Sequence, residues 1–124
     1  MNECKTYFAV FYNDGFDKKD FCETLLLDEV QLDTFYKEKL IIGFNEKYEV
    51  DINDMIRKTI KPLLGKEDEL DMLRRKYNLK YYLVLVPTIK VDGVHPILSL
   101  APDIIEFLYL TGTEEDLDYY IVDW

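Results

Sequence analysis

His95 and Ser99 are the only histidine and the only serine of the chain, and they stand four residues apart. A serine beside a histidine base is the pairing that activates a nucleophile in acyl-transfer enzymes. The exposed serine of a hydrolase elbow, however, needs flanking glycines, whereas leucines flank Ser99 and Pro96 favours an extended loop before it. We therefore interpret Ser99 as a loop or helix-capping residue, and we predict no catalytic residue and no enzymatic activity.

Metal binding has two candidate sites in the sequence, and both lack ligands. Asp92 and His95 are three residues apart, but no second histidine and no cysteine cluster completes a four-ligand site. Asp51, Asn53 and Asp54 resemble the start of a calcium loop. The sixth position of that loop, which needs glycine, is isoleucine here, and the twelfth, which needs glutamate, is proline. We predict no metal and no cofactor.

Phosphate binding and glycosidic chemistry also lack a sequence signature. The five glycines are isolated from one another, and none opens a glycine-rich loop of the kind that cradles phosphates. Glycoside hydrolysis needs two carboxylates across a cleft. Because the chain has 25 acidic residues, a suitable pair can always be nominated, so the presence of such a pair predicts nothing.

The carboxyl end combines acids with aromatic rings, a composition that is common where a protein meets a basic partner. From it we predict a partner-binding site made of Glu114, Glu115, Asp116, Asp118, Tyr120 and Trp124. The alternative interpretation is a solvated loop followed by a strand whose aromatic residues complete the core.

The charge of the whole chain bears on the class of partner. A formal net charge of −10 repels nucleic-acid phosphates and anionic lipid surfaces, so we expect neither nucleic acid nor membrane as a partner. The same charge speeds encounter with a basic protein, although many acidic bacterial proteins carry it for solubility alone. With no signal-peptide pattern and no apolar run of membrane-spanning length, the expected location is the cytoplasm.

The elements that must position these residues follow from periodicity and turn signals. The 124 residues are sufficient for a single α+β domain, 1–124, with one core. Strands are predicted at 5–12, 30–36, 39–44, 81–86 and 117–122. Helices are predicted at 18–26, 52–62, 66–77 and 102–111. We expect a mixed, largely antiparallel sheet of about five strands, with the helices mainly on one face.

Three details of these elements are open to test. The run 81–86 is apolar throughout and predicts a central strand, and Pro87 predicts an edge, a bulge or a strand break. In the last helix, the residues expected to pack inward are Ile104, Ile105, Leu108 and Tyr109. Cys4 and Cys22 match no metal or redox spacing, which favours reduced, partly buried thiols.

Several segments resemble a bacterial family known as domain of unknown function 4279. They are 96–100 (PILSL), 103–108 (DIIEFL) and 117–120 (LDYY), together with the strand, turn and helix of 7–25. Where that family would have a tryptophan-bearing strand, this chain has YEV at 48–50. The resemblance implies a small bacterial α+β protein and brings no catalytic residues with it.

Three functions from different classes remain open at this stage. The first is an interaction protein of immunity type that binds a basic partner, which the charge and the acidic, aromatic carboxyl end favour. The second is a small-molecule-binding sensor or enzyme with a tyrosine-lined pocket between sheet and helices. The third is a structural module that associates with copies of itself as a homo-oligomer.

Overall fold

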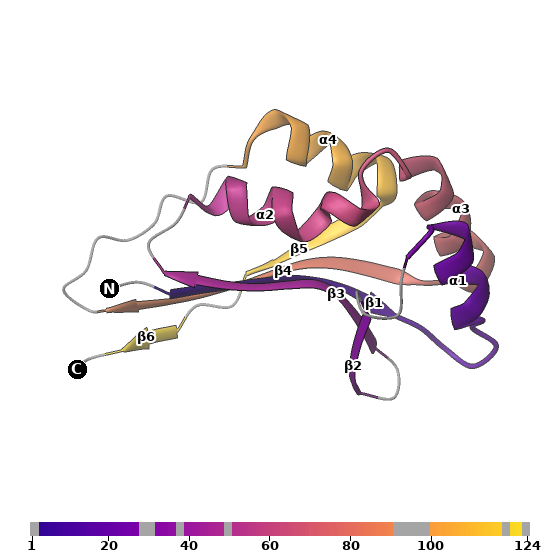
Figure 1. The fold of residues 1–124 in the computed structure, drawn as a ribbon, viewed down its shortest axis with the longest axis horizontal. Helices are drawn as coiled ribbons and strands as arrows, with labels where there is room; N and C mark the ends of the chain where they lie inside the picture. Colours follow the sequence, from indigo (N-terminus) through magenta and orange to yellow (C-terminus); the bar gives the residue numbers. More distant parts are fainter. Residues whose placement is uncertain are drawn as a thin grey trace.

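The computed structural model describes residues 3–27, 32–36, 39–48, 51–90, 100–117 and 120–122 (Figure 1). Within them the chain is α+β with a mixed sheet, as predicted. The strands are β1 (Glu3–Phe11), β2 (Leu32–Tyr36), β3 (Lys39–Tyr48), β4 (Lys80–Lys90), β5 (Thr113–Leu117) and β6 (Tyr120–Val122). The helices are α1 (Lys18–Thr24), α2 (Ile52–Ile60), the 3₁₀ turn η2 (Lys61–Leu63), α3 (Glu67–Tyr77) and α4 (Pro102–Thr111).

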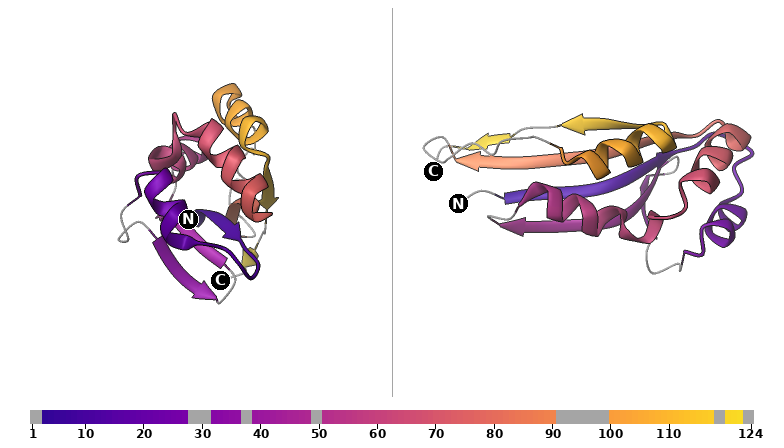
Figure 2. Two further views of the ribbon diagram at one scale, coloured as in Figure 1. Left: turned by 90° about the vertical axis from the view of Figure 1, so that its right-hand side faces the viewer. Right: turned by 90° about the horizontal axis from the view of Figure 1, so that it is seen from above.

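The sheet has the strand order β2-β3-β1-β4-β5, and β6 pairs with the far end of β4. β1 is antiparallel to both β3 and β4, and β2 is antiparallel to β3. β5 and β6 run parallel to β4. The predicted hairpin of the middle region is therefore present as β2 and β3, and the apolar run 81–86 lies in a central strand. β5 forms one edge of the sheet, which is visible in the view from above in Figure 2.

The carboxyl end differs from the prediction of one strand over 117–122. Two strands are present there, and the first begins at Thr113, directly after the left-handed Gly112 that ends α4. Thr113 is buried, and its hydroxyl lies 2.6 Å from that of Thr111. The next four residues are all exposed. The strand was missed because an exposed edge strand needs no alternation of apolar and polar residues.

Pro87 does not interrupt β4, so of the three alternatives expected there the strand break does not occur. β4 continues to Lys90, and Pro87 is paired with Cys4 of β1. On the other side of β4 the register with β5 ends at Leu85, and the register with β6 begins at Thr88. Proline lacks a backbone donor. Proline is tolerated on the side of β4 that faces β5 and β6, because Pro87 falls between those two stretches of pairing.

The core lies between the sheet and the helix layer. The large buried side chains of the strands include Phe8, Leu40 and Tyr81. They meet Ile56 of α2 and Phe107 of α4 in one hydrophobic cluster. Each large apolar side chain buried in this way contributes about 1.5–3 kcal/mol of transfer free energy. Figure 1 shows α2 and α4 lying over the same face of the sheet.

The inward face of α4 is only partly the one predicted: Ile104 is buried and Leu108 packs against the core as expected. The buried residues are Ile104, Phe107 and Thr111, a stripe of spacing three and four. Ile105 is 53% exposed and Tyr109 is 76% exposed, although both were expected to pack inward. The helix is apolar on both of these faces, so composition alone did not distinguish them.

A bulge in β3 sets the approach of α2 to the sheet. Thr6 is paired with Asn45 and Phe8 with Ile42, so Gly43 and its successor lie opposite the single residue Tyr7. Gly43 has a φ of +66°, the left-handed conformation of a bulge that begins with glycine. A Cβ at this position would lie 2.2 Å from the backbone oxygen of Thr59 in α2. Glycine therefore allows the helix backbone to approach the strand closely.

Candidate functional site

The structure places three of the predicted partner-binding residues on the edge strand β5. Glu114, Glu115 and Asp116 are all exposed. Tyr120 begins β6, where its backbone pairs with Thr88. The other predicted members, Asp118 and Trp124, lie outside the described residues. The candidate catalytic and metal residues Asp92, His95 and Ser99 also lie outside them.

Strand alternation divides these three acids between the two faces of the sheet. Glu115 is paired with Leu83, whose side chain is in the core under the helices. Glu114 is paired with Tyr82 and Asp116 with Val84, and neither Tyr82 nor Val84 belongs to that core cluster. Because successive side chains point to opposite faces, β5 presents negative charge on both sides of its edge.

The backbone of β5 is equally important for the site. β4 is its only strand neighbour among the described residues, and it ends the strand order of the sheet. An edge strand exposes a row of backbone donors and acceptors that a further strand can use. The acids and this edge together form a surface, the β5 edge, that can take up an extended chain.

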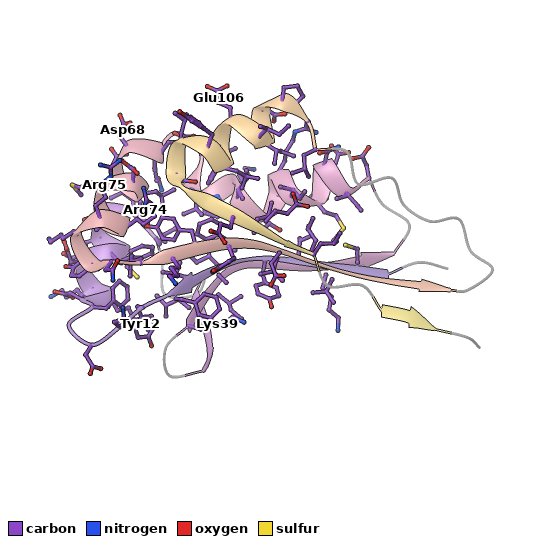
Figure 3. All side chains as sticks on the ribbon, turned by 180° about the vertical axis from the view of Figure 1, so that it is seen from behind. Tyr12, Lys39, Asp68, Arg74, Arg75 and Glu106 are labelled. Carbon is purple, nitrogen blue, oxygen red and sulfur yellow. The ribbon has the colours of Figure 1, made fainter. Side chains whose placement is uncertain are left out.

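The face of the sheet opposite α2 and α4 carries a group of aromatic rings. The Phe11 and Tyr82 rings meet edge to face, with 5.4 Å between their centroids. Lys39 Nζ lies 5.2 Å from the centroid of the Tyr7 ring and 5.5 Å from that of Phe11. Figure 3 shows Lys39 and Tyr12 on the side of the sheet away from Glu106 of α4. Sequence reasoning missed this group, although the alternation along β1 places Tyr7 and Phe11 on one face.

A cavity of about 670 Å³ lies at the end of this face. Its lining comes from β1 and the residues that follow it, from the end of α3, and from β4 and β5: Phe11, Tyr12, Asn13, Asn78, Lys80, Tyr82 and Asp116. Two of these residues are tyrosines. The predicted pocket between sheet and helices is a different place, because this cavity opens beside the sheet end and takes no side chain from α2 or α4.

Two groups of opposite charge line the cavity. Lys80 and Asp116 both line it, yet no ion pair joins them within the part of the chain that the structure describes. Asn78, which caps the end of α3 in a left-handed conformation, also lines the cavity. The cavity thus combines aromatic walls with a cation, an anion and the carboxamides of Asn13 and Asn78.

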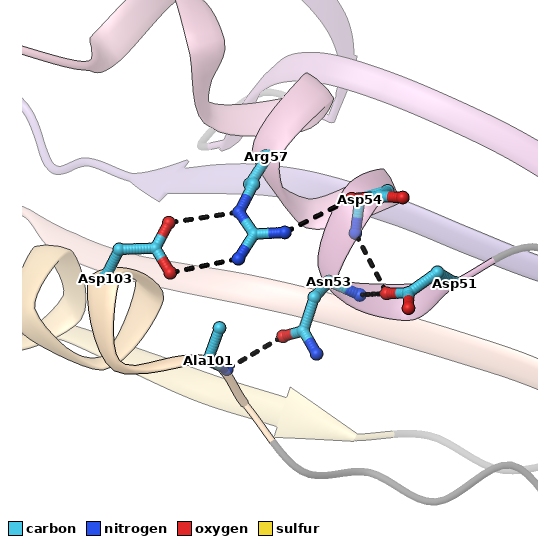
Figure 4. A network of polar contacts seen from close by, with 6 residues as sticks. All are labelled: Asp51, Asn53, Asp54, Arg57, Ala101 and Asp103. Atoms are coloured by element: carbon cyan, nitrogen blue, oxygen red, sulfur yellow. Dashed lines mark hydrogen bonds and ion pairs between the residues drawn. The ribbon is translucent and has the colours of Figure 1, made fainter.

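The residues that resembled a calcium loop have a structural role instead. Asp51 is the N-cap of α2, and its carboxylate accepts hydrogen bonds from the backbone nitrogens of Asn53 and Asp54. Asn53 Oδ1 in turn accepts a 2.9 Å hydrogen bond from the backbone nitrogen of Ala101, just before α4 (Figure 4). This turn therefore caps α2 and connects it to the start of α4.

An ion pair continues the same connection. The Asp103 carboxylate accepts from Arg57 Nε at 3.0 Å and from Arg57 Nη2 at 3.1 Å (Figure 4). The Arg57 guanidinium lowers the pKa of Asp103, and that carboxylate raises the pKa of Arg57. A smaller hollow of about 300 Å³ lies here, and this pair forms part of its wall. These charges are thus already engaged within the protein.

Three further observations concern the cysteines, potential metal ligands and helix length. Cys4 is buried and Cys22 is half-buried, and no disulfide joins them. The described residues contain no group of three potential metal ligands. None of the described helices has the length and apolar character needed to cross a bilayer.

Comparisons with known proteins give no relative for this chain. No protein-family model matches it, and neither the curated proteins nor the solved structures contain a match. The resemblance to domain of unknown function 4279 therefore stays a prediction, and the function must be argued from the residues themselves.

Proposed function

We propose that this chain is a protein-interaction module that binds an extended, basic segment of a partner protein along the β5 edge. The observation that carries the proposal is the position of Glu114, Glu115 and Asp116, three exposed acids in a row on a strand with an open edge. Strand addition supplies backbone hydrogen bonds, and alternate side chains supply the selectivity.

The distribution of charge favours a basic partner over a second copy of the chain. A strand added beside β5 would place its side chains on both faces, where it meets Glu115 on one side and Glu114 and Asp116 on the other. Like charges directly opposite each other destabilise a strand pair, and opposite charges stabilise it. Two copies meeting at this edge would bring six acids together, so self-association through β5 is disfavoured. An immunity-type role, in which the partner is a basic toxin domain, is one form of this function.

The proposal is tested with a synthetic peptide of alternating lysine and valine, titrated into the isotope-labelled full chain. We expect NMR shifts and slowed amide exchange at residues 113–117, and binding that weakens as salt is added because the exposed charges are screened. A peptide with glutamate in place of lysine is the ligand control and should not bind.

The matched protein variants carry equal changes of charge at different places. Replacing Glu114, Glu115 and Asp116 with Gln, Gln and Asn should weaken binding of the lysine peptide about three- to tenfold. The same exchange at Glu67, Asp68 and Glu69, three consecutive acids in the first turn of α3, should leave binding unchanged. Equal affinity of both variants, or shifts that avoid β5, would contradict the proposal.

A further inference from the structure

We propose that the cavity beside the end of the sheet binds a short peptide with free ends, a di- or tripeptide, and grips it by both of its terminal charges. This goes beyond binding at the β5 edge: the cavity shares Asp116 with that edge, whereas Lys80, Tyr82 and the two asparagines take no part in it. The cavity volume of about 670 Å³ lies within the range of small-molecule sites.

The two charges of the cavity select a ligand that is itself a zwitterion. Lys80 offers a cation for a carboxylate, and Asp116 offers an anion for an ammonium group. Among the described residues no ion pair joins the two, so both charges are available to a ligand in the cavity. Asp116 would repel a purely anionic ligand, and Lys80 would repel a purely cationic one.

The separation of these two residues along the sheet favours a peptide over a free amino acid, whose ammonium and carboxylate share one carbon. Asp116 is paired with Val84, four residues along β4 from Lys80, which corresponds to about 13 Å of strand. The lysine and aspartate side chains extend several ångströms from their backbones, which shortens the distance that a ligand between them must span. A peptide separates its ends by at most about 3.3–3.6 Å per residue, so two or three residues fit the shortened distance.

The remaining groups suit the middle of such a peptide. A peptide bond brings a donor and an acceptor that lose water on binding, and the carboxamides of Asn13 and Asn78 can supply both partners. The edge-to-face rings of Phe11 and Tyr82 offer an apolar wall for a ligand side chain. We therefore expect a peptide of two or three residues, one of which is aromatic or apolar.

The experiment titrates the tripeptide Ala-Phe-Ala into the isotope-labelled full chain and compares it with its N-acetylated and C-amidated forms. We expect shifts at the side-chain amides of Asn13 and Asn78 and at the backbone of 80–82. Each blocked form should bind about fivefold more weakly or worse, because one charged hydrogen bond is lost. This comparison uses the unaltered protein, so its outcome does not depend on whether a variant folds.

Two variants assign each end of the peptide to its residue. Asp116→Asn should weaken binding of Ala-Phe-Ala but should not weaken the acetylated form further, since that contact is already absent. Likewise, Lys80→Met should weaken binding of Ala-Phe-Ala but should not weaken binding of the amidated form further. Glu69→Gln, an exposed acid in the first turn of α3 and outside the cavity lining, is the control and should bind as the unaltered chain does. Equal binding of free and blocked peptides, or no shift at millimolar peptide, would overturn the proposal.

Discussion

Tyr81 shows how a single polar atom is accommodated in the core. Its side chain is almost completely buried, and its hydroxyl donates a 2.8 Å hydrogen bond to the backbone oxygen of Leu70 in α3. Its ring packs against Phe8, with 5.3 Å between the centroids. Burial raises the pKa of the Tyr81 hydroxyl well above its usual value, because the phenolate would be poorly solvated there. The residue thus connects β4 to α3 while it remains neutral.

The Tyr81→Phe variant should lower the free energy of unfolding by about 1 kcal/mol, because it removes the hydrogen bond to Leu70 and keeps the ring. Tyr82→Phe, on the other face of the same strand, is the matched control and should change it by less than about 0.5 kcal/mol. Urea unfolding of the three proteins provides the measurement. An equal effect of both changes would mean that the Leu70 contact contributes nothing specific.

Asp20 predicts a dependence of stability on pH. Its carboxylate accepts from Lys76 Nζ at 2.8 Å and from the Tyr77 hydroxyl at 2.5 Å, and these bonds lower its pKa below the ordinary 3.8. A lowered pKa in the folded state gives stability that is present above pH 3.8 and is lost as the pH falls through the folded value. The contact connects α1 to α3.

The comparison of Asp20→Asn with the unaltered chain isolates this contribution. The variant should be less stable at neutral pH, and the difference should shrink as the pH falls below 3.8. Thermal unfolding of both proteins, followed between neutral and strongly acidic pH, measures this difference in stability. Lys76→Met, which removes the largest cause of the lowered pKa, should reduce the same difference. A difference that stays constant over this range would show that the pair does not act through ionisation.

At the scale of elements, the bulge at Gly43 determines how closely α2 lies on β3. Gly43→Ala must place a Cβ 2.2 Å from the backbone oxygen of Thr59 and must hold alanine at a φ of +66°. We expect a loss of about 3 kcal/mol or more, of which the conformation alone accounts for about 1–2 kcal/mol.

A second glycine separates these two contributions. Gly15 also has a positive φ, of +91°, but a Cβ there would meet no atom within 4 Å. Gly15→Ala should therefore cost only the conformational part, about 1–2 kcal/mol. The two variants are compared by chemical denaturation. If both lose the same free energy, the close approach of α2 to Gly43 does not contribute.

The elements that sequence reasoning predicted best have a strong local signal. α3 begins with Glu67 and ends with Tyr77, within one residue of its predicted bounds, because acids open it and bases close it. The cap at Asp51 likewise fixed the start of α2. The bulge at Gly43 had no such signal, because it depends on a distant contact with Thr59.

The site was only partly accessible to the same reasoning. The acids of 114–116 were identified as a group by composition, but their division between two faces required knowledge that they lie in a strand. The cavity could not be predicted, because it joins the end of β1 to Asn78, Lys80 and Asp116, and no periodicity relates these positions. Sheet register, which sequence does not show, brings them together.

At the scale of the whole molecule, the net charge of −10 and the acids of the β5 edge act in the same direction. Proteins protect exposed strand edges with charge, because an uncharged edge pairs readily with a neighbouring copy. Three acids on five residues of β5 serve this purpose against other copies of an acidic chain. Under the proposed function the same acids favour a basic strand at this edge, so protection from self-association and selection of a partner would have one physical origin.

Removing this protection should make the chain associate with itself. In the variant with Gln, Gln and Asn at Glu114, Glu115 and Asp116, the apparent mass measured by light scattering should rise with protein concentration, while that of the unaltered chain stays constant. The variant with the same exchange at Glu67, Asp68 and Glu69 loses an equal amount of charge from a helix. If net charge alone controls association, both variants will associate. If the β5 edge controls it, only the first will, because backbone pairing needs an open strand as well as the loss of repulsion.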